Sequence, residues 1–211
     1  MQAAIVPPGV KVGVSAAACA ASPSHILLTA RTHVHELHRG ATAPTRAIAL
    51  PGVRELAAGL HRSWAASPEG VYTWTHRAPE PQLVWRGAAH IAAGLEHTLL
   101  LAHGEVWTVG LNTDGQLGRP ARALEHEFGR VTLGGAGAAA VRAGGDTSLA
   151  LGHDGSVWVW GNAEYGQLAA GDRIGAPQLA LEPGALGAIV DAAVGGSFIV
   201  LLNGKCGCRG R

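Results

Sequence analysis

A short motif recurs five times along the 211 residues, and this repetition constrains the fold more than any other feature of the sequence. Each copy begins with Ala and leads into a mainly apolar run, as in 93–101 (AGLEHTLLL) and 143–151 (AGGDTSLAL). The remaining copies begin at Ala21, Ala58 and Ala193. Tandem units of this kind bury their apolar faces on their neighbours, so the repeats are expected to share one architecture.

In the first four copies of the motif, a second segment follows the initial Ala at a nearly constant distance. The valines near its beginning lie 13 residues after the first Ala, or 14 in the fourth repeat: Val34, Val71, Val106 and Val157. In most copies a glycine turn such as Asp154-Gly155 separates the two segments, and such dipeptides favour tight hairpin turns. The stretches 106–109 and 157–160 are rich in β-branched and aromatic residues. Each repeat therefore predicts an antiparallel strand-turn-strand unit.

Repeats three and four share a further stretch after the second strand, GLNTDGQLG at 110–118 and GNAEYGQLA at 161–169. Repeats one and two have 40–46 and 77–81 in its place, so we expect short outer strands or loops there. A tandem unit of about 50 residues with several short strands is typical of propeller blades. The predicted fold is all-β, an incomplete β-propeller of about four blades plus part of a fifth.

The repeat pattern also divides the chain. We expect an N-terminal segment at 1–13, propeller repeats over 14–203 and an aberrant tail at 204–211. The repeats fall at about 14–50, 51–86, 87–136 and 137–186, with a partial copy at 187–203. The tail lacks the Val-x-x-Trp-Gly strand that the pattern requires after Asn203-Gly204. We therefore expect part of a longer array, with an apolar blade face left bare at each end.

Composition argues against several classes of protein. The formal net charge of +1, without long blocks of like charge, gives no direct signal for nucleic acid or an anionic membrane. The longest apolar stretches are far shorter than the ~20 residues that span a bilayer. Three cysteines, Cys19, Cys206 and Cys208, cannot build a disulfide framework, which suits an intracellular compartment.

These motifs resemble the repeat of the regulator of chromosome condensation family. That repeat carries Ala-(Cys/Gly)-Gly-x-x-His-(Ser/Thr), a strand ending in Trp-Gly, and Gly-x-Asn-x-x-Gly-Gln-Leu-Gly. The resemblance covers about Val14 to Asn203. Within the family, 160–169 and 192–196 look most similar to the mitochondrial exchange-factor-like member. That member is linked to mitochondrial fusion GTPases and to assembly of the mitochondrial ribosome, so the resemblance implies a mitochondrial location, with the cytoplasm or nucleus otherwise.

The resemblance implies a protein-binding propeller without catalytic residues, metal or cofactor. The leading hypothesis is guanine-nucleotide exchange on a small GTPase, because tighter binding to the nucleotide-free state accelerates release without covalent chemistry. The alternative is an assembly scaffold without exchange activity, in mitochondrial ribosome biogenesis or on chromatin. The partner-binding residues expected in the loops after the second strands are Asp114, Glu164, Tyr165, Asp172 and Arg173.

Positions shared by the repeats are expected to be structural. They are His25, His97, Gly94, Gly144, Gly110, Gly115, Gly161, Gly166, Trp107, Trp158 and Trp160. The ring nitrogens of the histidines are expected to bond turns within or between blades, and Thr147 occupies the same position in repeat four. The three tryptophans are expected in the core, whereas one of Trp64, Trp74 and Trp85 is expected at the surface.

Two clusters raise the alternative of a metal site. His33 and His35 would share one strand face, but Glu36 points to the opposite face and no further ligand completes the set. Cys206 and Cys208 lack a second pair at zinc-finger spacing. The glycines at 134–138 precede a strand and not a helix, so we expect a crossing between blades there and not a phosphate loop.

Overall fold

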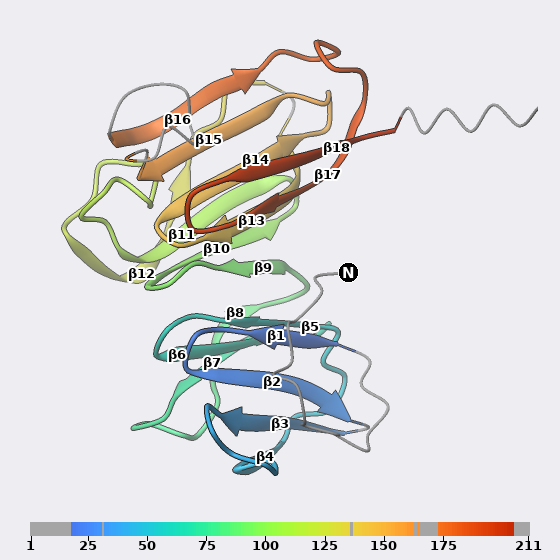
Figure 1. The fold of residues 1–211 in the computed structure, drawn as a ribbon, viewed down its shortest axis with the longest axis vertical. Coiled ribbons are helices and arrows are strands. Elements are labelled where there is room, and N and C mark those ends of the chain that lie inside the picture. Colours follow the sequence, from blue (N-terminus) through green and yellow to red (C-terminus); the bar gives the residue numbers. More distant parts are fainter. Residues whose placement is uncertain (1–17, 31, 136, 163, 165–172, 205–211) are drawn as a thin grey trace, which may run out of the picture. The chain divides into compact units, whose positions relative to one another are not determined.

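The computed structural model describes residues 18–30, 32–135, 137–162, 164 and 173–204, and the regular elements in these ranges are β-strands (Figure 1). The all-β prediction is confirmed. The chain divides into two compact units, Met1–Glu96 and His97–Arg211, with the boundary inside the third repeat.

The first unit contains two four-stranded antiparallel sheets in which neighbours in sequence are neighbours in space. The strands of the first sheet are β1 (Cys19–Ala21), β2 (His25–Ala30), β3 (His33–His38) and β4 (Arg46–Ala49). Those of the second sheet are β5 (Glu55–Ala58), β6 (Arg62–Ala66), β7 (Gly70–Thr75) and β8 (Gln82–Arg86). The last strand of the unit, β9 (His90–Ala93), contacts β5.

The second unit follows the same order. Its first strands, paired in sequence order, are β10 (His97–Ala102), β11 (Glu105–Leu111) and β12 (Leu124–Val131). The next sheet contains β13 (Ala138–Gly144), β14 (Thr147–Gly152), β15 (Val157–Asn162) and β16 (Arg173–Leu181). A two-stranded sheet follows, with β17 (Ile189–Val194) and β18 (Ile199–Asn203).

The hairpin between β10 and β11 shows how the sequence sets the register. Pairing runs from His97 opposite Gly110 to Ala102 opposite Glu105, so only two residues form the turn. Both have positive φ, 53° at His103 and 78° at Gly104. This is the geometry of the tight primed turns that match the twist of paired strands.

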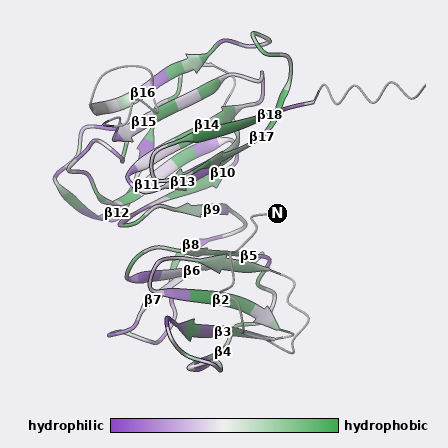
Figure 2. Ribbon diagram, viewed as in Figure 1, coloured by the Kyte–Doolittle hydropathy of each residue, from purple (hydrophilic) through white to green (hydrophobic). Residues whose placement is uncertain are grey.

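The core lies along β2, β6, β10 and β14, which are mostly or wholly buried. Every residue of β10 and β14 is buried, and Leu99, Leu100 and Leu149 are fully inaccessible. A strand that is covered on both faces needs no alternation of polar and apolar residues. The continuous apolar runs of the motif therefore mark strands packed between sheets, and Figure 2 shows them in green.

The outer strands differ between the units. Strands β4 and β8 have 4 and 5 residues, whereas β12 and β16 have 8 and 9. This agrees with the expectation of abbreviated outer strands in repeats one and two, although both sheets keep four strands. The shorter repeats lack the loop that leads into the long outer strands.

The tryptophans depart from expectation. Trp160 is fully buried as predicted, but Trp107 and Trp158 are only half-buried. The prediction that one of Trp64, Trp74 and Trp85 is exposed is wrong. The first two are 3% and 2% exposed and the third is half-buried.

Candidate functional site

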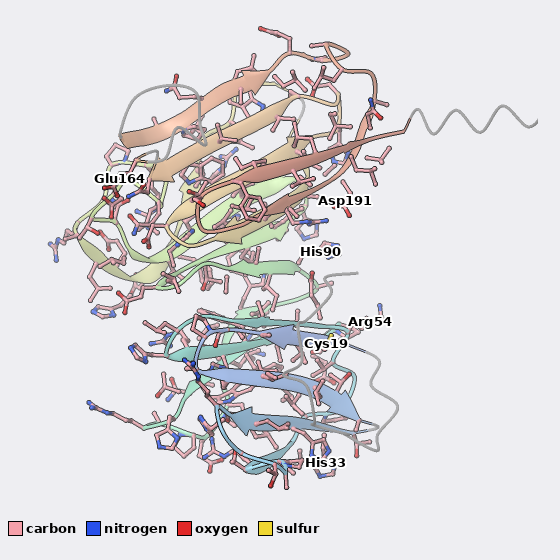
Figure 3. All side chains as sticks on the ribbon, viewed as in Figure 1. Cys19, His33, Arg54, His90, Glu164 and Asp191 are labelled. Carbon is pink, nitrogen blue, oxygen red and sulfur yellow. The ribbon has the colours of Figure 1, made fainter. Side chains whose placement is uncertain are left out.

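The loops that follow β11 and β15 contain two of the predicted partner-binding residues. Asp114 is half-buried in the first loop. Glu164, which is labelled in Figure 3, is exposed in the second. Arg173 is the first residue of β16. Tyr165 and Asp172, like the glycine Gly166, lie outside the described residues. Asp114 and Glu164 thus lie in equivalent loops of successive repeats, one position apart in the alignment of those loops.

Side-chain hydrogen bonds hold the first loop in shape. The Leu117 N–H donates to the side-chain oxygen of Asn112 at 3.0 Å, and the Asp114 N–H donates to the side-chain oxygen of Gln116 at 2.9 Å. Thr108 on β11 donates its hydroxyl to the Leu117 carbonyl at 2.8 Å. These contacts tie the loop to its own sheet. A loop anchored in this way presents Asp114 from a rigid base.

The same loop also packs on the next sheet through one carbonyl. Gln116 O accepts the Ser148 hydroxyl at 2.8 Å and the Trp160 indole N–H at 2.9 Å. Gly118 lies directly beside the indole: a Cβ there would stand 2.6 Å from Trp160 Nε1. Gly118 also has φ +64°, so the position needs glycine for both its backbone and its close packing.

His97 also contributes to the contact between this loop and the next sheet. Its Nε2 lies 2.8 Å from the Ser148 hydroxyl oxygen. Because Ser148 donates its one proton to Gln116 O, His97 must carry the proton on Nε2 and donate it to Ser148. The buried Nδ1 then has a lone pair without a hydrogen-bond partner among the described residues. Burial lowers the pKa of His97 to about 4, so the ring is neutral at pH 7.

His25 occupies the same repeat position in the first unit but has more partners. Its Nδ1 and Nε2 lie 2.8 Å from the hydroxyls of Ser24 and Ser63. Ser24 donates its proton to the Leu60 carbonyl, so it accepts from Nδ1–H, and Nε2 accepts from Ser63. Burial lowers the pKa of His25, while the nearby Glu36 carboxylate opposes that shift. The two histidines therefore carry their protons on opposite nitrogens.

Glu36 is a structural residue that sequence reasoning missed. Its side chain is 2% exposed, and its Oε2 accepts the Trp74 indole N–H at 3.4 Å. Arg46 Nη1 lies 3.7 Å from the same oxygen, and His38 Nε2 lies 3.5 Å from the other. The signal was available: the corresponding residues of repeats two and three are threonines, so a carboxylate at this position needed an explanation.

Two histidines of the β3 cluster lie side by side. The rings of His33 and His35 are 6.3 Å apart, and His33 is exposed (Figure 3). Across the described ranges, no group of three or more His, Cys, Asp or Glu side chains is arranged to hold a metal ion. Nor does any helix in this part of the chain have the length and hydropathy needed to cross a bilayer.

Models of a known repeat family match part of the chain. One model of the regulator of chromosome condensation (RCC1) repeat matches residues 154–202, and a second matches 88–116 and 138–167. The human RCC1-like G exchanging factor-like protein is 31% identical over 141 residues, which is 64% of this chain and 30% of that protein. The mouse RCC1 domain-containing protein 1 is 42% identical over 84 residues, 39% of this chain and 22% of that protein.

Solved structures share the fold. Human WBSCR16 has a TM-score of 0.78 at 23% identity, covering 92% of this chain and 62% of that structure. Prp20p from Saccharomyces cerevisiae has a TM-score of 0.74 at 18% identity, covering 87% and 54%. The sheets described above are thus blades of an incomplete β-propeller. The aligned part spans less than a third of the length of the curated relatives.

Proposed function

We propose that this chain, which carries repeats of the RCC1 family, is a non-catalytic protein-binding propeller that accelerates guanine-nucleotide exchange on a small GTPase. The observation that carries the proposal is the similarity over 141 residues to the human RCC1-like G exchanging factor-like protein. The similarly folded Prp20p is described as having binding properties to Gsp1p and histones. We place the activity in the mitochondrion, in keeping with the resemblance to the mitochondrial member of the family.

The loops after β11 and β15 fit this role. The side-chain oxygen of Gln116 accepts the backbone N–H of Asp114, and that of Asn162 accepts the backbone N–H of Glu164, so both carboxylates stand on hydrogen-bonded residues. A carboxylate directed at a nucleotide pocket competes with the phosphates for the lysine and magnesium that bind them. It therefore favours the nucleotide-free GTPase. Exchange is accelerated to the extent that this state is bound more tightly than the loaded one.

Release of a fluorescent GDP analogue from purified small GTPases tests the proposal. We expect the 211-residue chain to accelerate release from its cognate GTPase by at least about tenfold, equivalent to lowering the activation free energy of release by about 1.4 kcal/mol. The double variant Asp114→Ala, Glu164→Ala should lose most of this acceleration. Glu127→Ala, at an exposed position on β12, is the matched control and should retain it.

A second candidate function is an assembly scaffold without exchange activity, in mitochondrial ribosome biogenesis or on chromatin. The fold shared with Prp20p favours it, because the binding properties described for that protein include histones as well as Gsp1p. The release assay distinguishes the two functions. Unchanged GDP release across a panel of nuclear, cytoplasmic and mitochondrial GTPases would remove the exchange proposal and leave the scaffold.

A further inference from the structure

A pocket of about 360 Å³ lies at the opposite end of β11 and β15 from the Asp114 and Glu164 loops. Its walls are the turn between β10 and β11, the end of β12, the segment before β13, and the turn between β14 and β15. All of these segments belong to the second unit. The volume is at the lower end of the range for pockets that bind ligands.

The floor of this pocket is apolar and its rim is charged. Val106 and Val131 are buried, and Leu133 is half-buried. The side chains of Glu105 and Arg130 also line the pocket, but they are 42% and 61% exposed, with an oxygen and a nitrogen 3.0 Å apart. An apolar floor below a charged rim fits a ligand with an aliphatic stem and a charged end.

The rim carries more negative than positive charge. Besides the pair of Glu105 and Arg130, Asp154 reaches the rim: its Oδ2 lies 3.5 Å from the position of a Cβ on Gly135, which lines the pocket. Asp154 Oδ1 accepts the Ser156 hydroxyl at 2.6 Å and the Ser156 N–H at 3.0 Å. These hydrogen bonds lower the pKa of Asp154, so the group is ionised at neutral pH. Two carboxylates beside one guanidinium attract a cation more strongly than an anion.

Two histidines from consecutive hairpin turns also line the pocket. His103 has a φ of 53°, and no other non-glycine residue in the described ranges has a positive φ. Turns of this type favour Asn or Asp before the glycine, so the turn alone does not explain a histidine. His153 lies in the corresponding turn of the next sheet. A neutral imidazole has one acceptor nitrogen, so both rings can accept hydrogen bonds from a cationic ligand.

We propose that this pocket binds the side chain of an arginine or lysine from an extended segment of a partner protein. The aliphatic stem packs on Val106 and Val131. The guanidinium or ammonium group pairs with Glu105 and Asp154 at the rim, and Glu105 exchanges part of its contact with Arg130 for the ligand. An acidic side chain is disfavoured, because it brings a third carboxylate to the same rim.

NMR spectra of ¹⁵N-labelled full chain, titrated with N-acetyl-arginine methylamide, test the pocket. We expect saturable shifts of the Gly104, Gly137 and His153 amides, with a Kd on the order of 1 mM for a ligand of this size. N-acetyl-citrulline methylamide has the same shape without the charge, and should bind at least about tenfold more weakly. N-acetyl-glutamate methylamide should leave these amides unshifted.

Variants at the rim test the sign of the charge. Glu105→Gln and Asp154→Asn should each weaken binding of the arginine probe at least about threefold. Arg130→Gln should strengthen it, because that variant removes a competing cation. A role of Arg130 in folding alone predicts no such gain. Glu127→Gln is the matched control: Glu127 is exposed on β12 outside the pocket lining, and this variant should bind like wild type.

The absence of saturable shifts at up to about 20 mM arginine probe, well above the expected Kd, would overturn the proposal. Equal affinities for the arginine and citrulline probes would do the same, as would binding of the glutamate probe alone. Putrescine, a free diamine, separates the sources of the cation: if it binds more tightly than the capped arginine, the ligand is a small amine and not a partner protein. The outcome does not depend on exchange activity, because the pocket residues are separate from the Asp114 and Glu164 loops.

Discussion

Trp74 and Trp160 occupy the same repeat position in the two units, yet different chemistry satisfies their indole N–H groups. In the second unit the Trp160 indole donates to the main-chain carbonyl of Gln116 at 2.9 Å. In the first unit the Trp74 indole donates to the Glu36 carboxylate at 3.4 Å. Repeat one lacks the Gly-Gln-Leu-Gly loop, and a buried side chain takes the place of the missing carbonyl.

The comparison shows what is required when a side-chain carboxylate replaces a main-chain carbonyl as the acceptor. A buried carboxylate is unfavourable unless cations or hydrogen-bond donors surround it, whereas a peptide carbonyl carries no net charge. Accordingly, Arg46 and His38 lie near Glu36, whereas Gln116 O accepts from two neutral donors, the Ser148 hydroxyl and the Trp160 indole. The contact between β3 and β7 in the first unit, which we call the first interface, is thus stabilised by charge. The contact between the loop after β11 and β15 in the second unit, the second interface, is stabilised by the close fit of that loop against the Trp160 indole.

Gly118→Ala should give the largest effect, because the second interface depends on close packing. The methyl group would meet the Trp160 indole at a position that already requires positive φ. We expect a loss of about 3–4 kcal/mol in the free energy of unfolding, measured by urea denaturation. Gly87→Ala is the control: its φ is +88° but nothing lies within 4 Å, so about 1–2 kcal/mol is expected. Equal losses would mean that the loop does not pack on the indole.

His97 should make the second interface sensitive to acid. Its pKa is lowered to about 4 in the folded protein from an ordinary value of 6.5. The unfolded chain therefore binds a proton more readily between these values, and stability is lost as pH falls from 6.5 toward 4, by roughly 3 kcal/mol in all. Wild type should accordingly lose more stability than His97→Gln between pH 7 and pH 4 in urea titrations. Parallel pH profiles for the two proteins would contradict the buried, neutral ring.

Glu36 variants test the charged interface. Glu36→Ala leaves the Trp74 N–H buried without its acceptor and should cost about 2–3 kcal/mol in the free energy of unfolding. Glu36→Gln keeps an oxygen acceptor and loses the attraction to Arg46, so about 1 kcal/mol is expected. Hydrogen exchange of the β3 and β7 amides would locate the loss. If the amide variant is as unstable as the alanine variant, the charge and not the hydrogen bond is decisive.

The smallest effect is spectroscopic. Histidine ¹⁵N chemical shifts of the wild-type protein at pH 7 should show the proton on Nδ1 of His25 and on Nε2 of His97. Ser63→Ala and Ser148→Ala provide the assignments, since each perturbs the Nε2 signal of one ring. The same tautomer in both rings would contradict the predicted difference in hydrogen bonding between His25 and His97.

The hairpins could be predicted from sequence because their determinants are local. Gly104 and Asp154-Gly155 fix the turns, and the continuous apolar runs mark strands covered on both faces. The role of Glu36 could not be read in this way, because its partner Trp74 is 38 residues away on the next sheet. For the candidate site, the repeat pattern locates Asp114 and Glu164 in loops. The surface that a partner recognises depends on how those loops are oriented, which no spacing encodes.

The Gln116 carbonyl has a consequence for how such an array can change over evolutionary time. Every codon supplies a carbonyl, so the acceptor for Trp160 and Ser148 is inherited whatever amino acid is encoded at that position. The contact of Trp74 depends on one glutamate codon, and a single nucleotide change can delete it. Repeats that gain or keep the long loop are therefore buffered against genetic drift at this contact, and repeats that lose it become dependent on selection at a single site.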